Sequence, residues 1–336
     1  MALIGIDVEG VTEWMSVLIP GLKPPLAFSQ IAGGNSNLTY LCVDQNGSRY
    51  VLRRPPVGHI SATAHDMARE YRILFALQGS KVPVPNVLGL CEDLDVTGAP
   101  FYVMNFVEGQ VLHGPSDSQA LSGADRVSIS EHVAEVLADL HQTDFEAIGL
   151  GELARKGGYV ERQLKRWQGQ WQSNKTHDVP EMEEAGRLLQ DNLPVQKGAA
   201  IVHGDYRLGN MLVGGGRIRA LVDWELCTLG DPLADLGYLL NSWAEPGESA
   251  AKERVTGVGG FLPRNALCER YSAATGEDLE KIDYYRAFSH WRMAAINQGV
   301  YKRFLDGSMG QAKDQDLEQR KQNVVGRAKA ALSLLA

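Results

Sequence analysis

The stretch Ile201-Val202-His203-Gly204-Asp205-Tyr206-Arg207-Leu208-Gly209-Asn210 constrains the fold of this 336-residue sequence more than any other. Its first two residues are apolar and typical of a strand, and the polar residues that follow fall at the strand end, where loops expose functional groups. Asn210 comes five positions after Asp205. A second strand-like run, residues 218–222, is followed at once by Asp223, and a hairpin would bring that side chain alongside.

An aspartate, an asparagine and a second aspartate in this order indicate phosphoryl transfer. Their oxygens are the ligands that magnesium prefers, and one carboxylate is left to accept a hydroxyl proton. The same Asp-x4-Asn spacing occurs in the catalytic loop of protein kinases. Asp and Asn are also common turn residues, so a single Asp-x4-Asn would mean little. The complete ordered set favours a phosphotransferase over a chance arrangement of turns.

The first hundred residues are typical of a small antiparallel sheet with one main helix. Asn46-Gly47 supplies the positive φ angles that a hairpin turn requires. Apolar residues at helical intervals predict a helix from about residue 61 to residue 79. The predicted strands are residues 38–43, 49–53, 87–91 and 101–107.

Beyond residue 108 the apolar residues recur mainly with the helical period. We therefore predict an α+β chain with a β-rich lobe, residues 1–107, and a larger, mainly helical lobe, residues 108–336. The predicted helical stretches are residues 129–140, the region around Trp167 and Trp171, and residues 181–193, 235–243 and 317–335; short strands at 199–202, 211–213 and 218–222 interrupt them.

Composition excludes several classes of protein. Thirty-three basic against 41 acidic residues give a net charge of −8, which argues against nucleic-acid binding by bulk positive charge. No long apolar run predicts a membrane span, and the first residues have no basic signal-peptide region. The four cysteines lack the spacing of a zinc site or of a disulfide scaffold. We expect buried thiols in a cytoplasmic protein with no membrane or nucleic-acid partner; the sequence leaves the oligomeric state open.

The motifs together resemble those of the aminoglycoside phosphotransferase and choline kinase family, the small-molecule relatives of protein kinases. They are especially similar to the kinase-like domains that accompany some acyl-CoA dehydrogenases. The resemblance covers roughly residues 25–310 and implies a bilobal protein-kinase-like fold, in which the first lobe binds nucleotide and the second holds the catalytic loop and the acceptor pocket. The segments that carry it are Tyr50-Val-Leu-Arg-Arg-Pro-Pro56, Arg69-Glu70-Tyr71, Val103-Met-Asn-Phe-Val-Glu-Gly109 and Asp223-Trp-Glu-Leu-Cys-Thr-Leu-Gly-Asp-Pro-Leu-Ala-Asp235.

The resemblance assigns roles to the second lobe's motif residues by position. Asp205 resembles the catalytic aspartate that orients the acceptor hydroxyl and takes its proton. Asn210 and Asp223 resemble the two magnesium ligands. His203 resembles the histidine that braces the catalytic loop. Asp231 and Asp235 are expected to hold the backbone, Asp235 as a cap for the helix that follows it.

The resemblance also implies an ATP site in the first lobe. Residues 33–37 look like the loop that covers the phosphates, although Gly-Gly-Asn-Ser is also generic turn composition. Glu70 resembles the glutamate that braces the nucleotide-binding cation, and residues 104–107 resemble the hinge that meets adenine. The candidate nucleotide-binding residues are Gly33, Gly34, Asn35, Ser36, Asn37, Arg53, Glu70, Met104, Asn105 and Val107.

One position departs from the kinase pattern, because Arg53 stands where kinases have a strand lysine. Arginine keeps its charge and can grip phosphate or Glu70 in a bidentate way, but it is longer and planar. Strand alternation places the neighbouring Arg54 on the opposite face, where we expect a solvated charge.

The sequence thus predicts an ATP- and Mg²⁺-dependent phosphotransferase that acts on a hydroxyl of a small molecule. The acceptor is aminoglycoside-like, or a hydroxy acid or hydroxyacyl thioester. An inactive nucleotide-binding module remains open because of Arg53, whereas a protein kinase is disfavoured because no Ala-Pro-Glu motif follows Asp223. The residues considered for an acceptor pocket, each expected more often in the core, are Trp167, Trp171, Trp243, Trp291, Tyr284, Tyr285 and Arg292.

Overall fold

The computed structural model describes residues 3–31, 37–57, 66–248, 251–307 and 314–336. The chain forms two compact units, each built from more than one stretch of sequence. The first contains Met1–Val111, Glu146–Leu150 and Asn210–Leu226, and the second contains Leu112–Phe145, Gly151–Gly209 and Cys227–Ala336.

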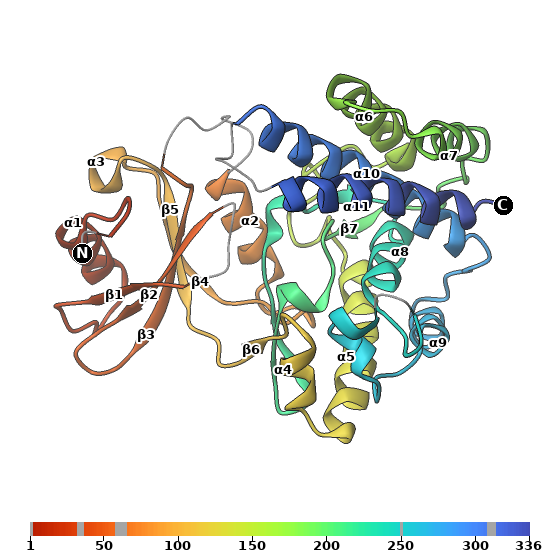
Figure 1. Cartoon of the computed structure of the whole chain (residues 1–336). Helices are drawn as coiled ribbons and strands as arrows, with labels where there is room; N and C mark the ends of the chain where they lie inside the picture. Colours follow the sequence, from red (N-terminus) through yellow and green to blue (C-terminus); the bar gives the residue numbers. More distant parts are fainter. Residues whose placement is uncertain (1–2, 32–36, 58–65, 249–250, 308–313) are drawn as a thin grey trace. The chain divides into compact units, whose positions relative to one another are not determined.

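A five-stranded antiparallel sheet forms the centre of the first unit, in the order β1-β2-β3-β5-β4 (Figure 1). The hairpin of β2 and β3 pairs Leu38 with Arg54 at one end and Val43 with Arg49 at the other. Gly47 has a φ of 80° in the connecting turn, as the Asn-Gly signal predicts. The strands are β1 (Ala27–Gln30), β2 (Leu38–Val43), β3 (Arg49–Arg54), β4 (Val87–Cys91) and β5 (Phe101–Asn105).

Helix α2 (Met67–Leu77) begins later than the sequence pattern suggests. The side chain of Asp66 accepts a hydrogen bond from the Arg69 amide and so caps the helix at that point. The five residues before it, 61–65, lie outside the described residues. Glu70 and four apolar residues form the buried side of this helix.

Two helices in the first unit were not predicted. Helix α1 (Val8–Leu18) buries Val11 and Met15 in the apolar core of the sheet, and α3 (Leu94–Thr97) is a single turn where we expected only a loop. The expected solvation of Arg54 is wrong. That side chain is 3% exposed, and its guanidinium donates to the carbonyl oxygen of Thr97.

A three-stranded sheet also belongs to the first unit. Strand β8 (Met211–Gly214) pairs with β6 (Gln110–Val111) on one side and with β9 (Arg217–Leu221) on the other. The amide of Leu221 donates to the carbonyl oxygen of Pro83, 2.7 Å away. These bonds group the β8–β9 hairpin with the first unit, while the division of the sequence after residue 107 stays a prediction.

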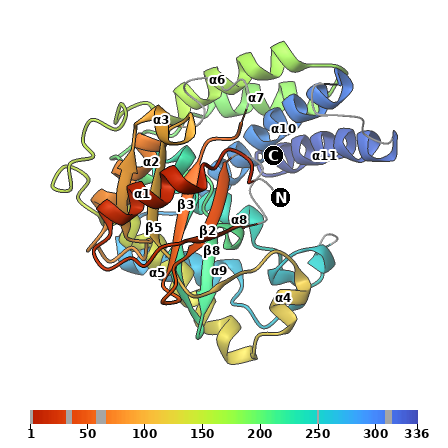
Figure 2. The same cartoon turned by 90° about the vertical axis from the view of Figure 1, so that its left-hand side faces the viewer.

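The second unit is mainly helical, with one two-stranded antiparallel sheet of β7 (Ala200–Val202) and β10 (Thr228–Gly230). Helices α10 and α11 lie side by side in both views (Figures 1 and 2). The α-helices of the second unit are α4 (Pro115–Gln119), α5 (Gly123–Gln142), α6 (Tyr159–Asn174), α7 (Pro180–Asp191), α8 (Leu233–Ser242), α9 (Arg264–Thr275), α10 (Ile282–Leu305) and α11 (Asp314–Ser333).

Close packing of α8 on α10 depends on a glycine. A Cβ atom at Gly237 would lie 2.8 Å from the carbonyl carbon of Tyr285, closer than packed atoms allow. The large aromatic residues of this unit are mostly core, as expected: Trp171, Trp243 and Trp291 are buried.

All four cysteines are free, as expected, but Cys268 is half-buried while Cys42, Cys91 and Cys227 are buried. Burial raises the pKa of the Cys42 thiol to about 12. Within the described residues, every helix is too short or too polar to cross a bilayer.

Candidate active site

Asn210 and Asp223 emerge together from the open end of the β8–β9 hairpin. Met211 pairs with Leu221, and the Val222 amide donates to the Asn210 carbonyl oxygen at 3.0 Å. The hairpin therefore places Asp223 next to Asn210, as the sequence pattern predicts. Asp223 has a φ of 69° and is the one non-glycine residue with a positive φ among the described residues. Such a backbone conformation is strained for a residue with a Cβ and recurs at functional sites.

Arg53 on β3 joins two carboxylates of the first unit. Its Nε lies 3.2 Å from Oε2 of Glu70 on α2, and its Nη2 donates to Oδ1 of Asp223 at 2.6 Å. Glu70 is 2% exposed, so Arg53 supplies the cation that a buried carboxylate needs. The expected partnership of Arg53 with Glu70 is present, and the contact with Asp223 adds a partner that the sequence did not reveal.

The charges of this cluster oppose the effect of burial. Burial by itself would lower the pKa of Arg53, but the carboxylates of Glu70 and Asp223 outweigh it and raise the pKa above its usual value. Burial raises the pKa of Glu70, and the Arg53 guanidinium opposes part of that increase. The cluster is therefore electrostatically coupled: removing Arg53 would leave a buried carboxylate without its cation.

The other candidate nucleotide residues lie on the same unit. Gly33, Gly34, Asn35 and Ser36 fall outside the described residues. Asn37 is buried; its Nδ2 donates to Oε2 of Glu225 at 3.4 Å, and its Oδ1 has no hydrogen-bond partner among the described residues.

The candidate hinge begins within β5. Met104 pairs with Val51 of β3 and with Val87 of β4, so it lies inside the sheet. The Asn105 side chain accepts a hydrogen bond from the Asn86 amide at 2.5 Å. Val107 follows β5 and is half-buried.

In the second unit, Asp235 holds the backbone of the His203-Gly204-Asp205 loop. One of its carboxylate oxygens accepts from the His203 amide at 2.6 Å and the other from the Gly204 amide at 2.9 Å. Burial would raise the pKa of Asp235, but His141, His203 and the Gly204 amide outweigh that effect and lower it. A buried aspartate therefore stays ionised and fixes the loop.

The expected role of Asp235 as a helix cap is wrong. Asp235 lies inside the first turn of α8, and its carboxylate is bonded to the loop. Asp231 bonds to the start of that helix instead, because its Oδ1 accepts from the Leu233 amide at 3.1 Å.

Two side chains that the sequence analysis did not single out reach Asp205. The Tyr238 hydroxyl is hydrogen-bonded to the Asp205 carboxylate, and the Arg207 Nε lies 3.3 Å from Oδ1 of Asp205. His203 Nδ1 accepts from the Asp205 amide at 3.2 Å, which agrees with a bracing role. Tyr238 follows Asp235 by three positions on α8, so helical spacing puts both on one face; that signal could have found it.

Arg292 of α10 completes this arrangement. Its Nη2 donates to the Gly204 carbonyl oxygen at 2.7 Å, and its guanidinium carbon lies 5.7 Å from the centre of the Tyr238 ring. Arg292 is thus a structural support of the loop and of Tyr238. The Asp205 carboxylate of the second unit is thus positioned by its loop, which Asp235 holds, and by the Tyr238 hydroxyl from α8.

The model of the phosphotransferase enzyme family, abbreviated APH, matches residues 27–296. The chain belongs to this family. Acyl-CoA dehydrogenase family member 10 of Mus musculus is 35% identical over 297 residues, covering 86% of this chain and 27% of that protein. The chain therefore spans about a quarter of that relative's length.

Solved structures show the same fold. A structure from Ralstonia eutropha JMP134 assigned to the aminoglycoside phosphotransferases matches with a TM-score of 0.83 and 33% identity, covering 98% of each chain. A thermostable mutant of aminoglycoside phosphotransferase APH(4)-Ia, in complex with AMP-PNP and hygromycin B, matches with a TM-score of 0.61 and 16% identity over 96% of this chain and 98% of that chain. The protein-kinase-like α+β fold predicted from the sequence is confirmed.

Proposed function

We propose that this phosphotransferase family member is an ATP- and Mg²⁺-dependent kinase that phosphorylates a hydroxyl group of a small molecule. The observation that carries the proposal is the loop in which Asp235 fixes the His203 and Gly204 amides and thereby presents Asp205. Phosphoryl transfer depends mainly on such positioning and on charge neutralisation. Family membership supports the reaction class, and the AMP-PNP complex of the APH(4)-Ia structure supports a nucleotide donor.

Asp205 is the proposed catalytic base. The acceptor oxygen attacks the γ-phosphorus, the bond from phosphorus to the β–γ bridging oxygen breaks, and ADP leaves with that electron pair. The acceptor proton passes to the Asp205 carboxylate. Tyr238 and Arg207 are positioned to orient this carboxylate through the contacts described above.

Asn210 and Asp223 are the proposed magnesium ligands. Their amide and carboxylate oxygens form a donor set that suits Mg²⁺, which binds through one or two carboxylates and completes its shell with water and substrate phosphates. No group of three or more His, Cys, Asp or Glu side chains able to hold a metal occurs in the described part of the chain. When bound, Mg²⁺ would neutralise phosphate charge.

The remaining nucleotide contacts follow from the family pattern. We propose that residues 33–37 cover the phosphates, that Arg53 grips them while Glu70 braces it, and that Met104, Asn105 and Val107 meet the base. A second candidate, a nucleotide-binding module without activity, is favoured by one observation. Arg53 already contacts Asp223, the carboxylate that the metal would use.

The test compares Asp205→Asn with the unmodified chain and with Asp316→Asn, a matched change on the exposed surface of α11. ATP binding is measured by calorimetry. Turnover is measured by mass spectrometry on a pool of hydroxyl compounds that contains aminoglycosides, hydroxy acids and hydroxyacyl thioesters. We expect Asp205→Asn to bind ATP within about threefold of the unmodified chain and to lose at least 100-fold in turnover. Unchanged turnover would remove Asp205 from its role, and ATP binding without transfer to any compound by the unmodified chain would favour the inactive module.

A further inference from the structure

A cavity of about 350 Å³ lies in the second unit, beside the start of α8. Its wall is formed by the end of α5, the segment before β7, the residues just before α8, and the chain from the end of α9 to the start of α10. Asp205, Tyr238 and Arg292 are not among the residues of this wall that the structure describes. Cavities of this size hold small-molecule ligands. The cavity is therefore a candidate binding site apart from the proposed catalytic base.

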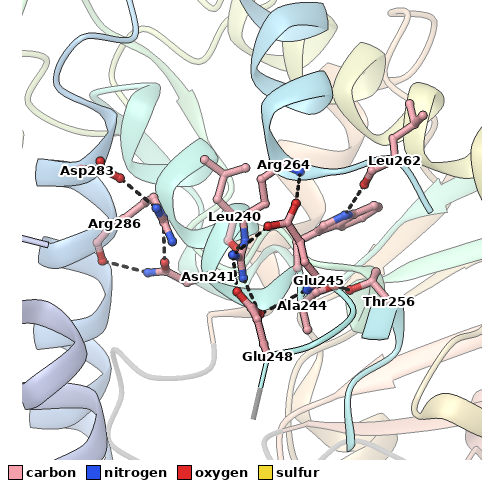
Figure 3. A network of polar contacts seen from close by, with 11 residues as sticks. Leu240, Asn241, Ala244, Glu245, Glu248, Thr256, Leu262, Arg264, Asp283 and Arg286 are labelled. Atoms are coloured by element: carbon pink, nitrogen blue, oxygen red, sulfur yellow. Dashed lines mark hydrogen bonds and ion pairs between the residues drawn. The ribbon is translucent and has the colours of Figure 1, made fainter. Parts of the chain in front are cut away.

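Carboxylates near the end of α8 in the same unit are paired with arginines (Figure 3). The Arg264 guanidinium donates to Glu248 at 2.9 Å and lies 3.4 Å from Glu245. The Arg286 guanidinium donates to Asp283 at 2.8 Å. Such pairing offsets the cost of holding a carboxylate partly out of water. These three carboxylates therefore need no further cation.

Asp231, in the wall of the cavity, has no such cation. The residue is 4% exposed; its Oδ2 accepts from the Tyr285 hydroxyl at 2.6 Å and its Oδ1 from the Leu233 amide at 3.1 Å. Both donors are neutral, and in the described chain no basic side chain has a nitrogen within 4.0 Å of this carboxylate. Burial raises the pKa of Asp231, and these two hydrogen bonds oppose part of that increase. A cationic ligand in the cavity would stabilise the charged carboxylate further.

The rest of the wall also suits an organic cation. Tyr271 and Tyr285 contribute aromatic rings, which attract cations through their negative faces. Glu277 is half-buried and, like Asp231, has no basic side chain within 4.0 Å among the described residues. Four acidic and two basic residues give the wall a formal charge of −2 with histidine neutral: Asp231, Glu277, Asp278, Glu280, Lys197 and Lys281. Its apolar part consists of Pro194, Val195, Pro232 and Leu233.

The wall of the cavity reaches the carboxylate that fixes the catalytic loop. His141 lines the cavity, and its Nδ1 lies 2.7 Å from the hydroxyl of Tyr271, which lines it as well. The Nε2 of the same ring lies 3.6 Å from Oδ2 of Asp235. Asp235 in turn accepts the amides of His203 and Gly204. One imidazole ring therefore separates the cavity from the anchor of the loop.

We propose that this cavity binds a small alkylammonium ion, with its nitrogen at Asp231, and that binding stabilises the loop of residues 203–205. The ammonium would make charge-assisted hydrogen bonds to the carboxylate, and the alkyl chain would pack on the apolar part of the wall. Opening of the loop separates Asp235 from His141 and so disturbs the cavity; a ligand that needs the intact wall opposes that opening. The inference does not depend on the proposed reaction, because neither binding nor loop opening requires phosphoryl transfer.

Binding is tested by calorimetric titration of the full chain with three probes of equal chain length. Hexylammonium carries the positive charge, hexanol is neutral, and hexanoate carries the opposite charge. We expect saturable binding of hexylammonium, at least tenfold weaker binding of hexanol, and no saturable binding of hexanoate. Absence of saturable hexylammonium binding, or equal affinity for hexanol or hexanoate, overturns the proposal.

Variants of the wall locate the site. Asp231→Asn keeps the shape of the side chain and should weaken hexylammonium binding at least tenfold, and Glu277→Gln should weaken it about threefold. Glu269→Gln is the matched control, since Glu269 is an exposed residue of α9 outside the wall. Circular dichroism checks that each variant is folded. Affinity equal to that of the unmodified chain in either folded wall variant overturns the site; if Asp231→Asn does not fold, Glu277→Gln and the three probes decide.

The link to the loop is tested by hydrogen exchange of the His203 and Gly204 amides, followed by NMR. Saturating hexylammonium should slow exchange of both amides at least fivefold in the unmodified chain, whereas hexanoate at the same concentration should leave it unchanged. Unchanged exchange in saturating hexylammonium overturns the proposed effect on the loop. Because neither measurement uses turnover, a kinase proposal refuted by an active Asp205→Asn variant would leave both results interpretable.

Discussion

Arg53 and Asp223 are joined by a 2.6 Å contact between Nη2 and Oδ1, while the Nε of the same guanidinium lies 3.2 Å from Glu70. A lysine ammonium is a single point charge, whereas the arginine fork can serve two carboxylates at once. The proposed metal ligand Asp223 therefore has a cationic partner within its own unit. A magnesium ion at Asp223 must therefore share the Asp223 carboxylate with Arg53 or displace the Arg53 guanidinium from it.

Arg53→Lys tests this competition. The shorter lysine, with its single ammonium group, should keep one of the two carboxylate contacts. We expect it to keep Glu70, because leaving the more deeply buried carboxylate unpaired costs more free energy. Asp223 is then released, and the Mg²⁺ concentration that half-saturates ATP binding should fall about three- to tenfold. Calorimetric ATP titrations at several Mg²⁺ concentrations measure it. Arg49→Lys, at an exposed position of the same strand, is the control, and equal Mg²⁺ dependence in the Arg53 variant contradicts the competition.

Arg53→Gln should destabilise the fold. It leaves the buried Glu70 without its cation, and breaking such a pair costs about 3–5 kcal/mol. Denaturant unfolding followed by circular dichroism measures the loss. The double variant Arg53→Gln, Glu70→Gln should recover at least half of it, because no buried charge remains. A double variant as unstable as the single one would show that packing of the guanidinium, and not charge, accounts for the effect.

Asp235→Asn should weaken the catalytic loop and the fold together. Asparagine retains one acceptor oxygen, so one of the two loop amides loses its partner and meets an N–H group instead. We expect a loss of about 2–4 kcal/mol in the free energy of unfolding. The folded pKa of Asp235 lies below its ordinary 3.8, so its contribution is present above that pH and is lost as the pH falls through the folded pKa. The variant should therefore lose less stability than the unmodified chain below pH 4; a parallel loss in both would contradict the assignment.

Local patterns predicted much of the fold and the candidate site. The Asn46-Gly47 turn, the strand before His203 and the hairpin before Asp223 all follow from residues close in sequence. The capping role of Asp235 was wrong because the preference of aspartate for helix starts is a local rule. The amides that Asp235 binds lie about thirty residues away in sequence. Arg54 was misjudged for the same reason.

The contact of Arg53 with Asp223 could not have been predicted from the sequence. It depends on tertiary structure, since 170 positions separate the two residues.

His290 should make the fold less stable in mild acid. Its folded pKa of about 4 lies below its ordinary 6.5, so the unfolded chain binds the additional proton between these values and stability falls as the pH drops from 6.5 toward 4. The contribution is at most about 3 kcal/mol. His290→Gln should reduce the difference in unfolding free energy between pH 7 and pH 4.5 by at least 1 kcal/mol. The same pH dependence in both proteins would show that His290 titrates normally.

Tyr238→Phe separates orientation of the proposed base from its chemistry. Phenylalanine fits the same space beside Arg292 but removes the hydroxyl that is hydrogen-bonded to Asp205. The contacts of Asp205 with Arg207, the shorter of them 3.3 Å, and the backbone bonds made by Asp235 are untouched. Because only the orientation of the base is changed, kcat should fall about 5- to 30-fold while KM for ATP stays within twofold. Tyr301→Phe, at a half-buried position of α10 that contacts His177, is the matched control and should leave kcat unchanged. If Tyr238→Phe retains full kcat while Asp205→Asn is inactive, Asp205 is held adequately by its loop and by Arg207, and Tyr238 contributes only packing.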